Sequence, residues 1–264
     1  MNLLNTFFNS KYFDNLNTFL AKKIFKIFKI FFVETSLREL PDINYPLINI
    51  KSDLEKSKLD NKNNYRPYIT YAHLPDLVEV LSDKNEQLNF VDIGAGNLNL
   101  YFYLKKNFKN INYFFKDQKE VETSVKDFIQ DERLKNISVV NIDSLELINI
   151  AYFGSSLQYI KDYKRELKNF FKKTNYILIA QSPFFSSKKN DEKIIIKQLN
   201  MHPYINYLYM FNYEKFLNFM TENNYDLIEK NVNNVTKFLN FKNFSKDFYT
   251  DINMYDLLFK LKNR

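Results

Sequence analysis

Hydrophobic and polar positions change their period along this chain, and the changes predict its elements. From about Tyr71 onward, short apolar runs typical of buried strands alternate with stretches that have the 3.6-residue period of helices. Alternating strands and helices build a parallel sheet with helices on both faces. We expect strands at 89–93, 111–116, 137–142, 148–153 and 176–180, and helices at 73–81, 98–108, 121–129 and 159–171.

The last part of the chain departs from this alternation. A helical pattern over 213–220 is followed by two strand patterns, at 225–232 and 254–261, without a good helix between them. The aromatic run over 204–213 is expected either to wall a binding pocket or, more simply, to be buried packing.

The first seventy residues form a separate region in the pattern. Residues 41–68 contain three prolines and a long polar run, which indicates a connector. We therefore divide the chain into a helical N-terminal extension and connector, 1–70, and an α/β domain, 71–264.

Within the extension, residues 16–33 predict a basic amphipathic helix that is too interrupted by lysines to span a bilayer. One interpretation is a membrane-surface anchor, with lysines that meet anionic lipid. The interpretation we favour is a helix that packs its phenylalanines onto the main domain, because most such stripes belong to a core. The polar face holds Lys22, Lys23, Lys26 and Lys29, and the apolar face holds Phe19, Leu20, Ile24, Phe28 and Phe31.

The composition excludes or disfavours several kinds of catalytic and metal-binding site. The chain has no cysteine, which excludes disulfides, thiolate nucleophiles and thiolate zinc sites. Its two histidines, His73 and His202, are far apart in sequence and argue against a histidine metal centre. The net charge of +7 weakly favours anionic partners. Without a convincing secretory signal, we expect a cytoplasmic protein, peripheral at the membrane if the 16–33 helix binds lipid.

Two of the three glycines in the chain, Gly94 and Gly96, stand in one turn after the strand at 89–93. An apolar strand, a Gly-x-Gly turn and a helical pattern together predict a nucleotide-type cofactor site. A dinucleotide site would place a third glycine at Asn99 and no acid at Asp92. An acid there suits the ammonium and sulfonium charges of S-adenosylmethionine.

Two more acids follow the next two strands. Asp117 comes about twenty residues after the glycines, where nucleotide folds place a ribose-binding carboxylate, although it could equally cap a helix. Asp143 could meet the adenine amino group, and it could equally cap a turn.

The third glycine, Gly154, follows the strand at 148–153, whose carboxyl end opens onto the same crevice. Gly154 would allow close approach of a ligand, and Ser155 and Gln158 offer hydrogen bonds.

These segments together resemble the Rossmann-like S-adenosylmethionine-dependent methyltransferases, and more narrowly a group often encoded among surface-polysaccharide biosynthesis genes. The resemblance covers roughly residues 40–261. It implies an α/β sheet of seven strands with the last strand antiparallel, and a cofactor surrounded by the glycine turn, Asp117 and the loop that contains Leu157. The motifs that carry it are Asp92 to Gly96, Tyr113 to Asp117, Ser156 to Ile160, Ile177 to Phe184 and Gln198 to Pro203.

The chain departs from that family at two positions. Leu98 stands where the family usually has another glycine, so we expect it either to strain the turn or to begin the helix and pack beneath it. Gln181 stands where an arginine is more usual, which removes support for an anion-binding role there.

Candidate residues on the acceptor side are Gln158, Tyr159, Gln181 and Gln198. His202 could serve as a general base, because imidazole titrates near neutral pH. The simpler expectation is that His202 hydrogen-bonds backbone in its His-Pro loop. Alignment of the acceptor alone could supply much of the catalysis.

The sequence therefore predicts a methyltransferase that uses S-adenosylmethionine on a small or glycan-like acceptor in surface-polysaccharide assembly. The alternative is a catalytically degenerate scaffold that binds the cofactor and joins a membrane complex through residues 16–33. Nucleic acid is a weaker candidate acceptor, because no base-flipping motif accompanies the positive charge.

Overall fold

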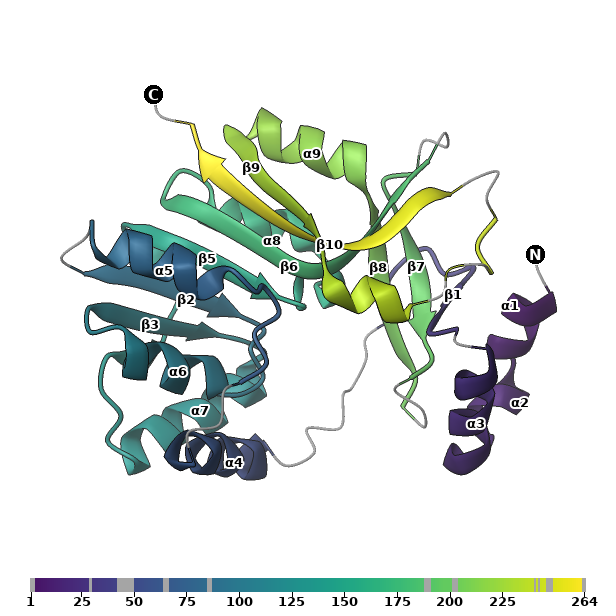
Figure 1. The fold of residues 1–264 in the computed structure, drawn as a ribbon, viewed down its shortest axis with the longest axis horizontal. Coiled ribbons are helices and arrows are strands. Elements are labelled where there is room, and N and C mark those ends of the chain that lie inside the picture. The colour runs from purple at the N-terminus through teal and green to yellow at the C-terminus, as the bar shows by residue number, and fades with distance from the viewer. Residues whose placement is uncertain are drawn as a thin grey trace.

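The computed structural model describes residues 3–28, 30–41, 50–63, 67–84, 87–187, 191–200, 204–239, 241, 243–245 and 249–262. Within these ranges ten strands join in one sheet, with helices on both of its faces (Figure 1).

Seven of the strands form the sheet that the resemblance implies. Their spatial order is β4 (Ile137–Val139), β3 (Ile111–Lys116), β2 (Leu88–Ile93), β5 (Ile148–Gly154), β6 (Thr174–Ser186), β10 (Thr250–Leu261) and β9 (Tyr225–Val232). The first five are parallel, and β10 is antiparallel to both of its neighbours. The Rossmann-like α/β fold with an antiparallel last strand is confirmed.

The number of strands is larger than the predicted seven. The long strand β6 continues past the core and pairs in parallel with β8 (Asn206–Asn212), which is followed outward by the antiparallel strands β7 (Lys193–Gln198) and β1 (Phe32–Glu34). Thus most of the aromatic run over 204–213, expected as packing or a pocket wall, forms strand β8. The last residues of the predicted 16–33 helix belong to strand β1. β1 pairs with β7, which is distant in sequence, so no local pattern reports it, whereas β8 pairs with its chain neighbour β7 as well as with β6.

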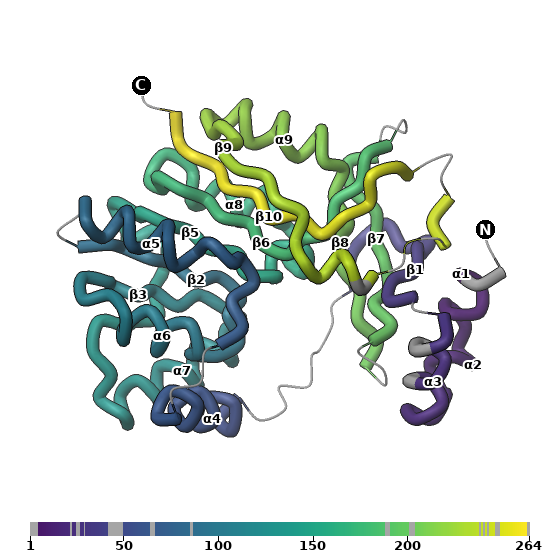
Figure 2. The backbone as a smooth tube through the Cα atoms, in the orientation of Figure 1, coloured from purple at the N-terminus to yellow at the C-terminus, as the bar shows by residue number. Residues whose placement is uncertain are grey.

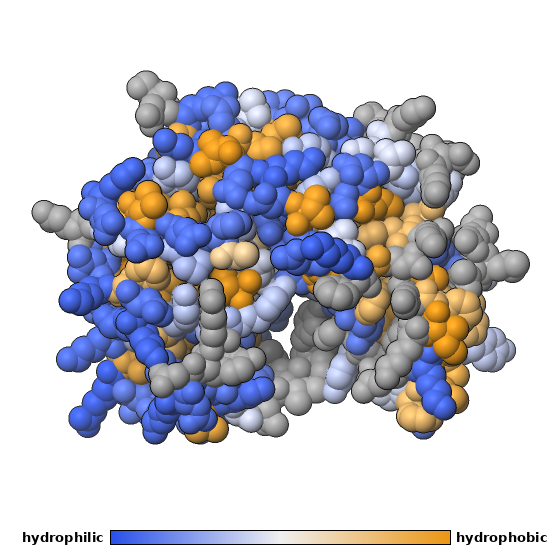
Figure 3. All heavy atoms as spheres, viewed as in Figure 1, coloured by the Kyte–Doolittle hydropathy of each residue, from blue (hydrophilic) through white to orange (hydrophobic). Residues whose placement is uncertain are grey.

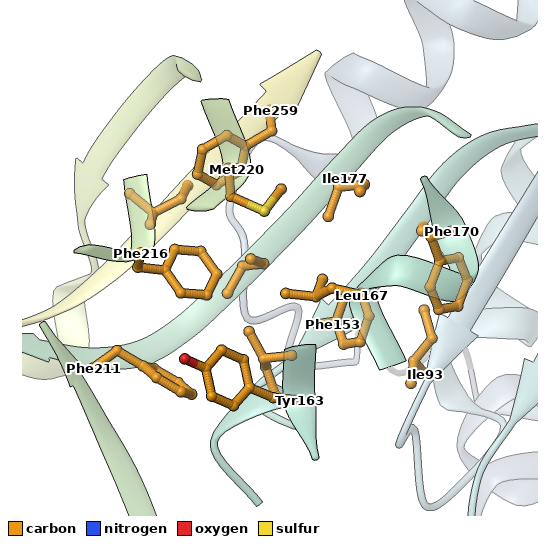
Figure 4. Packing of buried hydrophobic residues seen from close by; sticks show 14 of the residues in the cluster. Ile93, Phe153, Tyr163, Leu167, Phe170, Ile177, Phe211, Phe216, Met220 and Phe259 are labelled. Carbon is orange, nitrogen blue, oxygen red and sulfur yellow. The ribbon is translucent and has the colours of Figure 1, made fainter. Parts of the chain in front are cut away.

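Two helical layers cover the core sheet, as strand alternation requires. On one face lie α5 (Leu74–Ser82), α6 (Asn99–Asn107) and α7 (Lys119–Asp131), packed against a core that includes Phe90 and Tyr113. On the other face lie α8 (Tyr163–Phe170) and α9 (Tyr213–Glu222), packed against Val91 and Phe153. Figure 4 shows this second core, with Phe216 and Met220 of α9 directed toward Phe259 of β10.

The predicted connector contains a helix. α4 (Ile50–Lys62) packs near α6 and α7, and it buries only Leu54 and Ser57. With so few apolar residues, the helix has almost no hydrophobic periodicity, and for this reason the sequence pattern did not predict it. The division of the chain at residue 70 stays a prediction.

The N-terminal segment forms three short helices, α1 (Leu3–Phe8), α2 (Lys11–Asp14) and α3 (Thr18–Phe28), beside β1 (Figures 1 and 2). They enclose a small core with Leu199 of the main domain, whose other buried members are Phe8, Phe13, Ala21, Ile30 and Val33. Lys197 of β7 is buried, donates a hydrogen bond of 2.9 Å to the Phe8 carbonyl and pairs with Asp14. This contact fixes the helices to the sheet.

The favoured packing of the 16–33 stripe is wrong for most of its phenylalanine face. Ile24 packs on the small core and Phe31 packs on a buried cluster that includes Phe185 of β6, but Phe19, Leu20 and Phe28 are exposed. The side chains of Lys22 and Lys26, and the whole of Lys29, lie outside the described residues. Among the helices that the structure describes, none is both long and apolar enough to cross a bilayer.

Candidate functional site

The glycine turn after β2 is left-handed at two positions. Gly94 has φ +71° and Gly96 has φ +66°, values that L side chains rarely adopt. A Cβ on Gly94 would lie 2.5 Å from the Cβ of Ser156, whereas a Cβ on Gly96 would meet no atom within 4 Å. Gly94 therefore permits contact between two loops, and Gly96 borders open space.

Asp117 is held beside this turn by backbone groups. Its two carboxylate oxygens accept hydrogen bonds from the N–H of Gly96 (2.9 Å) and of Gln118 (2.7 Å). Burial raises the pKa of Asp117, and these two hydrogen bonds oppose the rise. The end of β3 thus presents a fixed carboxyl group to the space next to Gly96.

A pocket of about 600 Å³ opens at this place, at the carboxyl ends of β2, β3 and β5. Its volume lies in the range of roughly 300–1,000 Å³ typical of small-molecule sites, and its position is where open α/β sheets bind ligands. The described residues that line it are Ile93, Gly94, Gly96, Lys116, Asp117, Gln118, Val121, Ser155, Ser156, Tyr159, Ile160, Glu166 and Asn206.

The predicted residues Gly94, Gly96, Asp117, Ser155 and Tyr159 all line this pocket. The residues that sequence reasoning missed include Gln118 and Val121, for which the strand end at Asp117 was an available signal. Glu166 lies in the first turn of α8, where an acid is common in any helix, and Asn206 comes from the unpredicted β8, so neither had a specific local signal.

Asp92 lies next to the turn but is directed toward the α5–α7 side of the sheet. It is buried, and the hydroxyl of Tyr113 donates a hydrogen bond to its Oδ2. Burial raises the pKa of Asp92 to about 7, although this hydrogen bond opposes the shift. Asp92 does not appear among the described residues that line the pocket.

Three other predicted cofactor residues also lie outside the described lining. A Cβ on Gly154 would lie 2.7 Å from the ring of Tyr152, so packing of that ring accounts for this glycine. Leu157 is fully buried in the core. Asp143 occupies a short 3-10 turn with its side chain 79% exposed and 3.9 Å from Lys173.

The departure at Leu98 does not strain the turn. Leu98 has φ −110°, is fully buried, and immediately precedes α6. Because its backbone is not left-handed, the position needs no glycine. The expectation that Leu98 begins the helix and packs beneath it is confirmed.

At the far side of the pocket, neutral polar side chains from three elements meet. The Tyr159 hydroxyl donates a hydrogen bond of 2.9 Å to Oε1 of Gln198, and the Asn206 amide donates one of 2.7 Å to the same oxygen. We call Tyr159, Gln198 and Asn206 the amide cluster. Tyr159 precedes α8, while the other two belong to β7 and β8.

The remaining predicted acceptor residues are engaged elsewhere or lie outside the described residues. Gln158 is buried, and its side-chain oxygen accepts a hydrogen bond from Ser182. Gln181 has φ +51° in a bulge of β6, and its N–H donates to the buried carboxylate of Asp256 at 2.8 Å. His202 lies outside the described residues. Within the described chain, no group of three or more side chains suited to a metal occurs.

No protein-family model matches this chain, and no curated protein matches it. Among solved structures, the chain is similar to an S-adenosylmethionine-dependent methyltransferase from Clostridium acetobutylicum, with 13% identity, a TM-score of 0.44 and coverage of 79% of this chain and 98% of that chain. It is also similar to 1,6-didemethyltoxoflavin-N1-methyltransferase from Burkholderia thailandensis, solved with bound 1,6-didemethyltoxoflavin and S-adenosylhomocysteine (12% identity, TM-score 0.48, coverage of 88% of this chain and 95% of that chain). Because these sequence identities and TM-scores are low, the proposed function rests on the residues of this chain's own pocket.

We predict that alanine at the two glycines of the turn has unequal effects on stability. Gly96→Ala should cost roughly 1–2 kcal/mol, the usual penalty of a left-handed L residue. Gly94→Ala should cost roughly 1–3 kcal/mol more, because its Cβ must also displace Ser156. Urea unfolding of both variants measures the difference, and equal losses would contradict the contact with Ser156.

We also predict a pH dependence that originates at Asp92. The folded state retains the Asp92 proton up to about pH 7, whereas the unfolded chain loses it near pH 3.8. The associated stability is present in full below the lower value and decreases as the pH rises toward the upper one. Asp92→Asn should therefore gain stability relative to wild type by roughly 1.4 kcal/mol per pH unit across this window. Parallel pH profiles of the two proteins in urea unfolding would disprove the assignment.

Proposed function

We propose that this protein is an S-adenosylmethionine-dependent methyltransferase. The observation that carries the proposal is the carboxyl group of Asp117, held by the Gly96 turn in the lining of a pocket at the strand ends. The absence of a side chain at Gly96 leaves open space beside its backbone, so a ligand can approach the backbone closely. A carboxyl group at the end of the second core strand suits the hydroxyls of a ribose.

The residues of the pocket fit the parts of such a cofactor. Asp117 would accept hydrogen bonds from the ribose, and the apolar side chains of Ile93, Val121 and Ile160 would contact the flat base. Asp92 stays a prediction for the ammonium end, and Asp143 stays one for the adenine amino group. When bound, the cofactor supplies a methyl group on a positively charged sulfur.

The amide cluster is the proposed acceptor contact. Tyr159 and Asn206 line the pocket, and neither carries a charge at neutral pH. Neutral hydroxyl and amide groups suit a hydroxyl-rich acceptor, such as a small molecule or a glycan. Surface-polysaccharide assembly is the setting that the sequence resemblance of residues 40–261 supports.

The residues would act mainly by positioning. The amide cluster would orient the acceptor, and alignment of the reacting atoms can lower a barrier without a dedicated base. His202 stays a prediction for the residue that takes the acceptor proton. The degenerate-scaffold alternative rested on Leu98 and on the absence of an evident base, and the unstrained helix start at Leu98 removes the first of these grounds.

We predict that Asp117→Asn weakens S-adenosylmethionine binding by about 10- to 100-fold, because hydrogen bonds to a charged group contribute roughly 1.5–3 kcal/mol. Asp127→Asn on the exposed face of α7 is the matched control and should bind normally. Isothermal titration calorimetry measures both. Tight binding of NAD with no response to S-adenosylmethionine would contradict the proposed cofactor.

A second variant separates the acceptor from the cofactor. Tyr159→Phe keeps the ring and removes the hydroxyl that bonds Gln198. With hydroxyl-bearing sugars as acceptors, KM for the acceptor should rise about tenfold, the value of one lost hydrogen bond, while cofactor affinity stays unchanged. Formation of S-adenosylhomocysteine measures turnover. An unchanged acceptor KM in this variant would place the acceptor elsewhere.

A further inference from the structure

The N-terminal helices expose apolar side chains on the side away from their small core. Figure 3 shows apolar residues at the surface over these helices, at the lower right of the view. The exposed fractions lie between 42% and 86% for Phe7, Tyr12, Phe19, Leu20, Ile27 and Phe28. We call these six residues the outer face.

This concentration is unusual within the described chain. Six of its fifteen exposed large hydrophobic residues fall within residues 3–28, and the other nine are spread over the remaining ranges. Single exposed hydrophobic residues are normal on protein surfaces, whereas a gathered set marks a site of contact with another apolar surface.

The charge of the same segment indicates which kind of surface the outer face contacts. Residues 1–33 contain five lysines and one acid, a net charge of 5 − 1 = +4. The one acid, Asp14, is already paired with Lys197 of the main domain. Lys23 is exposed, and its ammonium lies 4.6 Å from the centre of the Phe19 ring. Lysines interleaved with exposed aromatic residues are the pattern of a helix at a lipid interface.

We propose that α1, α2 and α3 dock this protein onto the surface of an anionic membrane. The outer face would enter the boundary between headgroups and acyl chains, and the lysines would contact anionic headgroups. α3 has 11 residues, so it lies in the plane of the interface and does not cross it. The proposal rests on this surface alone and is independent of the proposed methyl transfer.

The inner contacts explain how such a unit remains attached to the enzyme domain. Lys197 donates a hydrogen bond to the Phe8 carbonyl, and Leu199 packs in the small core of the helices. Strand β1, which follows α3, joins the sheet by pairing with β7. Two residues of the outer face, Phe7 and Phe28, also contact the ring of Phe8 in the small core, and they remain exposed on their other side.

The test is co-sedimentation of the full-length protein with phosphatidylcholine vesicles that contain or lack phosphatidylserine. Wild type should partition to the anionic vesicles and bind the neutral ones more weakly. The double variant Phe19→Ser with Ile27→Ser should lose about tenfold or more in partitioning, because two apolar side chains no longer enter the interface. The matched control carries the same change at two exposed apolar positions elsewhere, Val80→Ser with Ile228→Ser, and should bind as wild type does.

Circular dichroism and thermal unfolding of both double variants verify that they fold, which is expected because all four side chains are exposed. Three results would overturn the proposal: no partitioning of wild type at low salt, equal binding to anionic and neutral vesicles, or equal losses in the two double variants.

Discussion

The contact between Gly94 and Ser156 is the constraint on which the rest of the site depends. Ser156 Oγ donates a hydrogen bond of 2.5 Å to the carbonyl of Ile93, and its Cβ occupies the space that a side chain at position 94 would need. This locks the turn after β2 to the loop after β5. With the turn fixed, the N–H of Gly96 donates a hydrogen bond to Asp117, which follows β3. Three strand ends thus converge through the two left-handed glycines of one turn, and the pocket is the space between them.

A second constraint lies in β6, which serves two parts of the sheet. β10 pairs with both halves of β6 on one side, while on the other side the first half pairs with β5 and the second half with β8. The change occurs at the bulge of Gln181, where the left-handed backbone is held by the carboxylate of Asp256. Asn233 donates to both oxygens of that carboxylate, at 2.9 and 3.0 Å, and satisfies a buried acid whose pKa burial raises. The extension of the sheet, and with it the amide cluster, therefore depends on a polar contact inside the core.

Local patterns predicted much of the core sheet, because its strands and helices each carry their own periodicity. The strand at Ile111–Lys116 and the strand at Tyr225–Val232 have the predicted bounds. Strand β1 was missed because its partner β7 is distant in sequence, whereas β7 and β8 are neighbours in the chain and their apolar runs were not interpreted as strands. Within the site, Gly94, Gly96 and Asp117 stand at strand ends and could be identified from spacing. The role of Gly154 could not be identified from spacing. The ring of Tyr152 occupies the space that a side chain at position 154 would need, and a sequence does not show such a neighbour.

Strand β7 has a further consequence, which follows from two adjacent residues. Successive side chains of a strand point to opposite faces, so Lys197 and Gln198 are directed apart. Lys197 holds the N-terminal helices, and Gln198 belongs to the amide cluster. The two units therefore attach to opposite faces of the same strand. In the proposed docked state, β7 would set the distance between the membrane surface and the pocket.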